Sequence, residues 1–218
     1  MIRVLLADDH VIVRAGLREL LADTGDVTVT GEAGNGQEVL ASVRKHDYDV
    51  LVLDMSMPGR SGIELIRQVK SEKPKLRILV LSMHGEAQYA VRAIRAGASG
   101  YLTKDSASDQ LVAAIRRIAA GGAYVSPETA ERLALDFNRP AEEAAPHMLL
   151  SDREFQVFQM IVGGRTISDI AEALSLSVKT VSTHKTRIME KMHLDNQAAL
   201  VRYAVRHKLV DESGEPDS

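Results

Sequence analysis

Residues 49–54, Asp-Val-Leu-Val-Leu-Asp, form a short apolar run that ends in the carboxylate of Asp54. Such a run is typical of a strand that is buried on both faces, as strands of parallel sheets are. Ligand sites in open parallel α/β sheets lie at the carboxyl ends of the strands. The sequence therefore predicts that Asp54 belongs to a functional site at one edge of a buried parallel sheet.

Two other apolar runs lead to ionisable side chains in the same way. Residues 2–7 are followed by the pair Asp8 and Asp9, and residues 99–102 are followed closely by Lys104. Because the carboxyl ends of parallel strands meet at the same edge of a sheet, we expect these side chains to converge on Asp54. The predicted site contains three acids and one ammonium group.

The first 120 residues alternate short apolar runs with amphipathic segments. The apolar runs predict strands near 2–7, 27–33, 49–54, 77–82 and 99–102. The amphipathic segments predict helices near 10–23, 36–46, 62–72, 86–96 and 106–120, and Gly25, Gly97 and Gly121 stand where helices should end. Parallel strands need helical crossovers, so the predicted fold class is an α/β doubly wound, five-stranded parallel sheet.

The pattern changes after residue 121. Residues 122–148 contain three prolines and no sustained strand, and they are predicted to form a linker with one helix near 127–137. Four helical patterns follow, near 151–162, 166–174, 178–192 and 196–207. The predicted organisation is a first domain over 1–121, the linker, an all-α four-helix domain over 149–210 and an acidic tail over 211–218.

Composition and charge limit the function classes. The 218 residues are 45% hydrophobic and 26% charged, and the absence of cysteine excludes disulfides and thiolate metal sites. No apolar run approaches the roughly 18 residues of a membrane span, and we expect a cytoplasmic protein with no membrane partner. The net charge is −3, yet two acids between 177 and 208 face seven bases, Lys179, Lys185, Arg187, Lys191, Arg202, Arg206 and Lys208. Such a basic patch favours nucleic acid as a partner.

The predicted acidic pocket suits phosphoryl chemistry. Three neighbouring carboxylates need a cation to stay ionised, and oxygen ligands select Mg²⁺ or Mn²⁺. Asp54 would be the nucleophile that accepts a phosphoryl group. Lys104 would pair with one phosphoryl oxygen, and Ser82, at the end of the fourth predicted strand, would donate its hydroxyl to another. Taken singly, the acids are more often caps or turn residues and the lysine a solvated charge, but their shared position at strand ends favours function.

These residues make positions 1 to about 120 similar to a two-component receiver domain. The resemblance implies that Asp54 is the phosphoacceptor and that Asp8, Asp9, Asp54 and the main-chain carbonyl of Ser56 bind the metal ion. It also implies that Lys104 and Ser82 are switch residues, together with Tyr101, whose ring turns inward on activation. Without these matches, Tyr101 would be a half-buried strand tyrosine.

Several positions leave alternatives open. Lys104 is followed by Asp105, where the family usually has proline after a cis peptide bond. A cis bond before a residue other than proline costs about 3–4 kcal/mol. Whether the bond between Lys104 and Asp105 is cis or trans therefore stays open. Met83 would narrow access to Asp54. His84 either guides a hydrolytic water or is an exposed loop residue, and the spacing of His10 and His46 does not suggest a metal site.

The third helix of the second half, residues 178–192, is basic. Four of its apolar residues recur at helical spacing and are predicted to face the core, Val178, Val181, Ile188 and Met192. The outward residues carry hydroxyls for base edges or phosphates and cations for phosphates. The predicted DNA-binding residues are Lys179, Thr180, Ser182, Thr183, Lys185, Thr186 and Arg187. His184 would pack or bond a phosphate, and the alternative for the whole face is an ordinary solvated surface.

The preceding helix ends in a short turn, as helix-turn-helix geometry requires. Segment 149–209 resembles the LuxR-type helix-turn-helix domain through Leu150-Ser-Asp-Arg-Glu, Ile170-Ala-Glu-Ala-Leu and Lys179-Thr-Val-Ser-Thr-His. Glu154 matches the family's first-helix acid, whose role is structural. A receiver followed by this module is the arrangement of NarL/FixJ-type response regulators.

That resemblance implies a set of partners. They are a sensor histidine kinase, double-stranded DNA with paired half-sites, and a second copy of the chain on phosphorylation, and RNA polymerase is a further candidate. The dimer contact would use the last helix, about Asn196 to His207. Val201, Ala204 and Val205 are either interface residues or core of their own domain.

The predicted function is a two-component response regulator in which phosphorylation at Asp54 controls dimerisation and sequence-specific DNA binding. It is not a metabolic enzyme, although it would accept a phosphoryl group and dephosphorylate itself. One alternative is a phosphohydrolase of the haloacid-dehalogenase type, but Ser56 stands where that family has its acid/base aspartate. Another is a constitutive DNA-binding protein with a structural receiver, which the cost of clustering so many charges disfavours.

Overall fold

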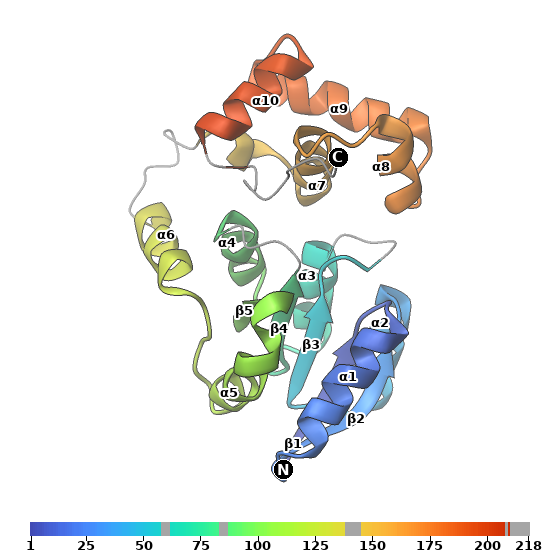
Figure 1. The fold of residues 1–218 in the computed structure, drawn as a ribbon, viewed down its shortest axis with the longest axis vertical. Coiled ribbons are helices and arrows are strands. Elements are labelled where there is room, and N and C mark those ends of the chain that lie inside the picture. The colour runs from blue at the N-terminus through green and yellow to red at the C-terminus, as the bar shows by residue number, and fades with distance from the viewer. Residues whose placement is uncertain (58–61, 83–86, 138–144, 208, 210–218) are drawn as a thin grey trace, which may run out of the picture. The chain divides into compact units, whose positions relative to one another are not determined.

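The computed structural model describes residues 1–57, 62–82, 87–137, 145–207 and 209. The chain divides into two compact units, Met1–Leu133 and Ala134–Ser218, which are described separately. The first unit contains a parallel five-stranded sheet in the order β2-β1-β3-β4-β5 (Figure 1). Its strands are β1 (Ile2–Ala7), β2 (Val27–Ala33), β3 (Val50–Asp54), β4 (Arg77–Ser82) and β5 (Gly100–Thr103).

Helices cover both faces of this sheet. They are α1 (Val11–Ala22), α2 (Gly36–Lys45), α3 (Gly62–Glu72), α4 (Ala87–Arg95) and α5 (Ala107–Ala119). One core cluster joins α2, α3 and α4 to the sheet, and a second joins α1 and α5 to the other face. All residues of β3 are buried, which is why this strand is a continuous apolar run.

The predicted doubly wound sheet is confirmed, and each strand boundary lies within one residue of its prediction. Gly25, Gly97 and Gly121 follow their helices with φ of 71°, 111° and 92°, a region that favours glycine. Beyond the predicted domain end at 121, Tyr124 still forms a parallel bridge with Gly100. The predicted linker helix is present as α6 (Pro127–Phe137).

The second unit is helical, as predicted. A short 3₁₀ turn, η3 (Pro146–Leu149), precedes α7 (Asp152–Val162), α8 (Ile167–Ala173), α9 (Val178–Met192) and α10 (Gln197–Arg206). Phe155 and Phe158 stack at 5.8 Å between ring centroids in the core. Side chains at each helix start satisfy free N–H groups: those of Ser151, Thr166, Ser177 and Asn196.

One core prediction is wrong. Val181, Ile188 and Met192 are buried on the inner face of α9, but Val178 is 52% exposed. Val178 is the first residue of the helix. Because helical side chains lean toward the amino terminus, a side chain at this position points past the end of the helix and away from the packed turns.

None of the helices in the described ranges combines the length and the apolar character that crossing a bilayer requires.

Candidate functional site

The carboxyl ends of β1 and β3 bring the predicted acids together. Asp8 directly follows β1 and Asp54 ends β3, and these neighbouring strands pair through Ala7 and Leu53. Both carboxylates are buried, with 2% and 1% of the residue exposed. One ligand atom from each of Asp8, Asp9, His10 and Asp54 lies within 4.8 Å of the others. The topology thus produces the acidic cluster that strand ends predicted.

Lys104 links the two buried carboxylates. Its ammonium group lies 2.7 Å from Asp8 Oδ2 and 2.9 Å from Asp54 Oδ2, and its side chain is 12% exposed. Residues that are far apart in the sequence therefore share one ion-pair network. One ammonium group cannot neutralise three carboxylates, so the cluster keeps an excess of negative charge.

The environment of Asp54 controls its protonation. Burial raises the pKa of Asp54, while the Ser56 N–H, 3.0 Å from Oδ1, and the Lys104 ammonium act in the opposite direction. Burial also lowers the pKa of Lys104, but hydrogen bonds and charge from Asp8 and Asp54 outweigh it and raise that pKa. The ammonium group is thus held in its charged form beside the carboxylates.

The second acid of the pair leaves an oxygen unsatisfied. Among the described residues, none donates a hydrogen bond of acceptable geometry to Asp9 Oδ1, which is buried. His10 Nδ1 lies 3.1 Å from this oxygen and 3.2 Å from Asp8 Oδ1, so its imidazole stands between the two acids. A buried carboxylate oxygen without a hydrogen bond, in a negative cluster of oxygen donors, fits a hard divalent cation.

Sequence reasoning missed two neighbours of this cluster. The spacing of His10 suggested no metal-binding pattern, yet its ring contacts both acids. Arg14, on α1, donates from Nη1 to the main-chain carbonyl of Asp8 and from Nε to Glu32, at 3.2 Å. Only the position of His10 directly after the acid pair was a signal in the sequence, because the reach of Arg14 depends on how α1 packs.

The other predicted residues lie around the cluster. Ser82 is buried at the end of β4, where it pairs with Thr103, while Asp54 pairs with the preceding Leu81. Tyr101 is 7% exposed and packs in the core cluster that includes α4. Its ring is therefore inside the receiver-like unit.

The open questions at the neighbouring positions have different outcomes. The described residues contain no cis peptide bond, so the bond between Lys104 and Asp105 is trans. Met83 and His84 lie outside the described residues.

The outer face of α9 carries the predicted DNA-binding residues. Lys179, Ser182, Thr183, Thr186 and Arg187 are exposed, and Thr180 and Lys185 are partly buried. Thr183 and Thr186 donate their hydroxyls to main-chain carbonyls of their own helix, at 2.9 and 3.1 Å. Lys185 donates to Gln197 on α10, at 2.7 Å.

Three residues of this face keep their side chains available. In the described part of the chain, Lys179, Ser182 and Arg187 form no side-chain hydrogen bond or ion pair. Two cations flank a hydroxyl along the outer face of one helix. Cations can neutralise phosphates and a hydroxyl can bond a base edge, so this surface suits a nucleic-acid groove.

Glu154, on α7, and His184, on α9 itself, have structural surroundings. Glu154 forms a capping box with Ser151 and pairs with Lys191 at 2.6 Å. Burial raises the pKa of Glu154, but these partners outweigh it and lower that pKa. His184 is partly buried, and burial together with Arg153 and Arg187 lowers its pKa. A neutral, partly buried imidazole favours the packing alternative for His184.

The alternatives for α10 are divided between core and surface. Ala204 is fully buried, Val201 is partly buried and Val205 is 63% exposed. The hydroxyl of Tyr203 is hydrogen-bonded to His147 Nδ1 at 2.7 Å. The Tyr203 ring stacks on His207, with 4.2 Å between the ring centroids. Ala204 is thus core of its own unit, and Val205 is left as a surface residue.

Comparisons with known proteins agree for both units. Residues 4–116 match the model of the response regulator receiver domain, and residues 148–204 match that of bacterial regulatory proteins of the luxR family. Response regulator GacA of Pseudomonas viridiflava is 40% identical over 213 residues, which cover 98% of this chain and 100% of GacA. Response regulator UvrY of Escherichia coli K12 is 37% identical over 209 residues, 96% of each chain.

Two solved structures resemble the chain, one of them over nearly its whole length. RcsB from Salmonella enterica serovar Typhimurium, bound to promoter rprA in the presence of the phosphomimetic BeF₃⁻, has 29% identity and a TM-score of 0.63, covering 93% of this chain and 97% of that one. A LuxR-family two-component response regulator from Aurantimonas has 37% identity and a TM-score of 0.59, covering 64% of this chain and 99% of that one.

Proposed function

The chain belongs to the NarL/FixJ family of two-component response regulators, and from this premise we propose that phosphorylation of Asp54 controls its binding to DNA. Such proteins regulate transcription and are not metabolic enzymes. The proposed boundaries are a receiver domain over 1–121, a linker over 122–148, a DNA-binding domain over 149–210 and an acidic tail over 211–218.

The phosphoacceptor role rests on the geometry of Asp54. One carboxylate oxygen accepts the Ser56 N–H and the other accepts the Lys104 ammonium, so the group is oriented before a donor arrives. A carboxylate oxygen of Asp54 attacks the phosphorus of a kinase phosphohistidine. The bond from phosphorus to the histidine nitrogen breaks, and an acyl phosphate forms on Asp54.

The surrounding residues have distinct roles in this transfer. Phosphorylation removes the free carboxylate of Asp54, and Lys104 then pairs with a phosphoryl oxygen. Ser82, at the end of the neighbouring strand, supplies a hydroxyl to another phosphoryl oxygen. Tyr101 is the third switch residue in this proposal. The acyl phosphate is later hydrolysed at the same site.

The metal requirement is supported by the donor set. Asp8, Asp9, Asp54 and the main-chain carbonyl of Ser56 would hold Mg²⁺ or Mn²⁺, and the unsatisfied oxygen of Asp9 fits this role. When bound, the cation supplies positive charge to the phosphoryl oxygens during transfer. Arg14 donates to the main-chain carbonyl of Asp8 and would help to position this residue.

The output role rests on the outer face of α9. Lys179 and Arg187 would neutralise phosphates, while Ser182 would face base edges in the major groove. Thr180, Thr183, Lys185 and Thr186 complete the proposed contact surface. Phosphorylation would favour a homodimer on paired half-sites, with Val205 on α10 as an exposed contact, and RNA polymerase is a further candidate partner. A DNA-binding partner of a histidine kinase is expected to act in the cytoplasm.

The proposed phosphorylation is tested by incubating the protein with Mg²⁺ and acetyl phosphate and measuring its intact mass. The wild type should gain one phosphoryl group, and Asp54→Ala should gain none. Asp105→Ala is a matched control, because Asp105 is an exposed aspartate next to Lys104. An unmodified wild type, or an Asp54→Ala variant modified to the same extent, would contradict the proposal.

A further inference from the structure

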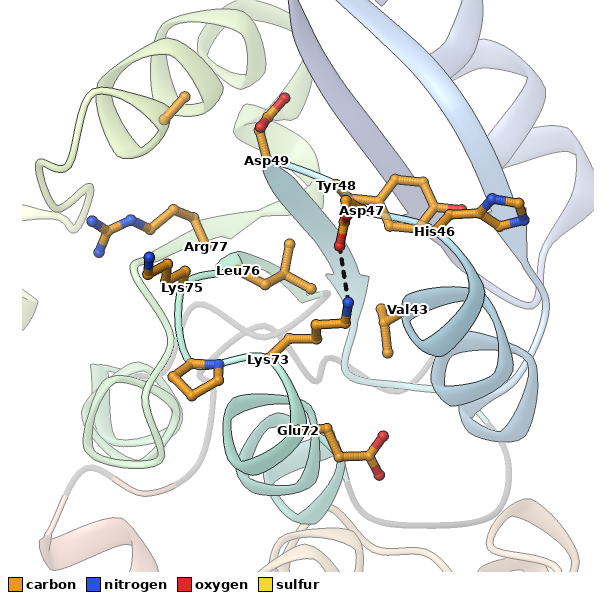
Figure 2. A pocket seen from close by; sticks show the side chains of 12 residues that line it. Val43, His46, Asp47, Tyr48, Asp49, Glu72, Lys73, Lys75, Leu76 and Arg77 are labelled. Carbon is orange, nitrogen blue, oxygen red and sulfur yellow. Dashed lines mark hydrogen bonds and ion pairs between the residues drawn. The ribbon is translucent and has the colours of Figure 1, made fainter.

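A cavity lies at the opposite end of the sheet from Asp54. Its volume is about 570 Å³, and it is lined by the segment from α2 into β3, the segment from α3 into β4, and the end of α5 (Figure 2). Sites for small molecules usually have volumes of about 300–1,000 Å³. The cavity is therefore large enough for a compact organic ligand.

Part of the cavity lining is apolar. Val43, Tyr48 and Leu76 are buried residues that line it. The hydroxyl of Tyr48 is already hydrogen-bonded to Ser42 Oγ at 2.6 Å, so the ring contributes mainly its apolar surface. Only 1%, 8% and 5% of these residues is exposed, so they form a small apolar floor on which the apolar part of a ligand can rest.

Each carboxylate that lines the cavity already has a cation. Asp47 pairs with Lys73 at 2.9 Å, as the dashed line in Figure 2 shows. Asp49 pairs with Arg3 at 3.3 Å, and Glu72 pairs with Arg44 at 2.6 Å. Hydrogen bonds from these cations lower the pKa of all three carboxyl groups. The acids are thus ionised and neutralised without a ligand.

Two further cations are left over. Across the described residues, neither Lys75 nor Arg77 forms a side-chain hydrogen bond or ion pair, and both are exposed. Figure 2 places them on the opposite side of the cavity from His46. Three of the lining residues are thus cations, and with Arg3 and Arg44, which pair with lining acids, five cations accompany three carboxylates. The charge of Arg77 also helps to lower the pKa of nearby Lys70, after the effect of burial, which indicates a positive potential here.

Helix ends are the alternative explanation for these cations. The carboxyl termini of α2, α3 and α5 point toward this region, and helix carboxyl ends attract positive charge. However, the carbonyl groups that follow α3, those of Pro74 and Leu76, already accept hydrogen bonds from Lys70. Lys75 and Arg77 are therefore not needed by the loop after α3, and among the described residues neither side chain bonds a carbonyl group at the end of α2 or α5.

We propose that this cavity binds a small organic anion, such as an aromatic carboxylate or sulfonate. The anionic group would pair with Lys75 and Arg77, and the apolar body would lie against Val43, Tyr48 and Leu76. The site is separate from the phosphorylation site, although Arg77 begins the strand that ends at Ser82. Its test is therefore independent of the proposed function.

The probe for this site is 8-anilinonaphthalene-1-sulfonate, titrated into the full-length protein and followed by ¹H–¹⁵N NMR. We expect saturable binding with shifts at the amides of Tyr48 and Leu76. The double variant Lys75→Ala/Arg77→Ala should bind at least about tenfold more weakly. Arg165→Ala, which removes an exposed arginine of the second unit, should bind as the wild type does.

An uncharged analogue, N-phenyl-1-naphthylamine, tests the charge requirement. It should bind the wild type more weakly than the sulfonate and should be insensitive to the double substitution. Thermal unfolding of the double variant checks that its fold is intact. The proposal is overturned if binding does not saturate, if the shifts lie elsewhere, or if the folded double variant binds the sulfonate as tightly as the wild type.

Discussion

The two units each bury a carboxylate beside a lysine, but the surroundings of these pairs differ. In the first unit, Lys104 serves both Asp8 and Asp54, and a buried oxygen of Asp9 has no hydrogen bond among the described residues. In the second unit, Glu154 is fully engaged by Lys191 and Ser151. Burial of a charge thus indicates chemistry where its partners are too few and structure where they suffice.

The units also place their proposed contact residues differently. In the receiver, the chemical groups are buried at the ends of strands, where the backbone topology fixes them. In the DNA-binding unit, Lys179, Ser182 and Arg187 lie exposed on one helix. The first arrangement suits a small reacting group, and the second suits a large surface such as a DNA groove.

The largest expected effect comes from removing the lysine of the receiver cluster. Lys104→Met leaves Asp8 and Asp54 without their ammonium partner and should lower the free energy of unfolding by about 3–5 kcal/mol in the presence of a chelator. Urea unfolding at neutral pH measures this change. Adding Mg²⁺, or Asp54→Asn in the same chain, should recover part of the loss. If Lys104→Met is as stable as the wild type, Lys104 is not needed to neutralise Asp8 and Asp54, and the contrast with the Glu154 pair is lost.

The next effect concerns the α9 surface. Ser182→Ala should change the preference among base pairs by about 1–3 kcal/mol, whereas Arg187→Ala should weaken binding to all sequences and reduce the salt slope by about one. Fluorescence anisotropy on DNA selected from a random pool measures both, at several salt concentrations. Lys185→Ala should have a smaller effect than Arg187→Ala, because Lys185 already donates to Gln197. Equal, sequence-independent losses in all three variants would refute this division.

A smaller effect is expected at Glu154. Its partners lower its pKa in the folded state, so the ion pair stabilises the unit above the unfolded pKa of about 4.3, and this stability is lost as the pH falls through the folded pKa. Lys191 is 41% exposed, which screens the pair. Glu154→Gln should therefore cost about 1 kcal/mol at pH 7 and less below pH 4.

Amide exchange of α7 and α9 measures this loss within the second unit. Glu172→Gln is the matched control, because Glu172 is an exposed glutamate on α8 and its substitution should leave exchange unchanged. A cost at Glu154 that stays constant with pH would show that the pair is not its cause.

The smallest expected effect is at Val178. Since this side chain is 52% exposed, Val178→Ala should change the free energy of unfolding by less than about 0.5 kcal/mol. Ile188→Ala, on the buried face of the same helix, should cost about 2–5 kcal/mol. Urea unfolding of the two variants compares them directly. Similar losses would mean that Val178 is part of the core after all.

Most of the fold could be predicted because apolar periodicity and strand burial are local properties of the sequence. The run that ends at Asp54 is apolar because β3 is covered on both faces. The convergence of Asp8, Asp54 and Lys104 also followed, because parallel topology brings strand ends together without any knowledge of side-chain packing.

Contacts between side chains of separate elements could not be predicted in this way. The reach of Arg14 to the carbonyl of Asp8 depends on how α1 packs, and the bond from Lys185 to Gln197 depends on how α9 and α10 meet. The exposure of Val178 depends on where the helix begins. Such details require the three-dimensional arrangement, because equal spacing in the sequence allows several side-chain positions.

The central claim is that the state of Asp54 controls DNA binding, and the most direct test is DNA affinity with and without acetyl phosphate in the presence of Mg²⁺. For the wild type, the phosphodonor should increase affinity by about 5- to 150-fold, the usual range of coupling between two sites. For Asp54→Ala, affinity should not respond. Equal affinities of the wild type with and without a verified phosphoryl group on Asp54 would contradict the claim.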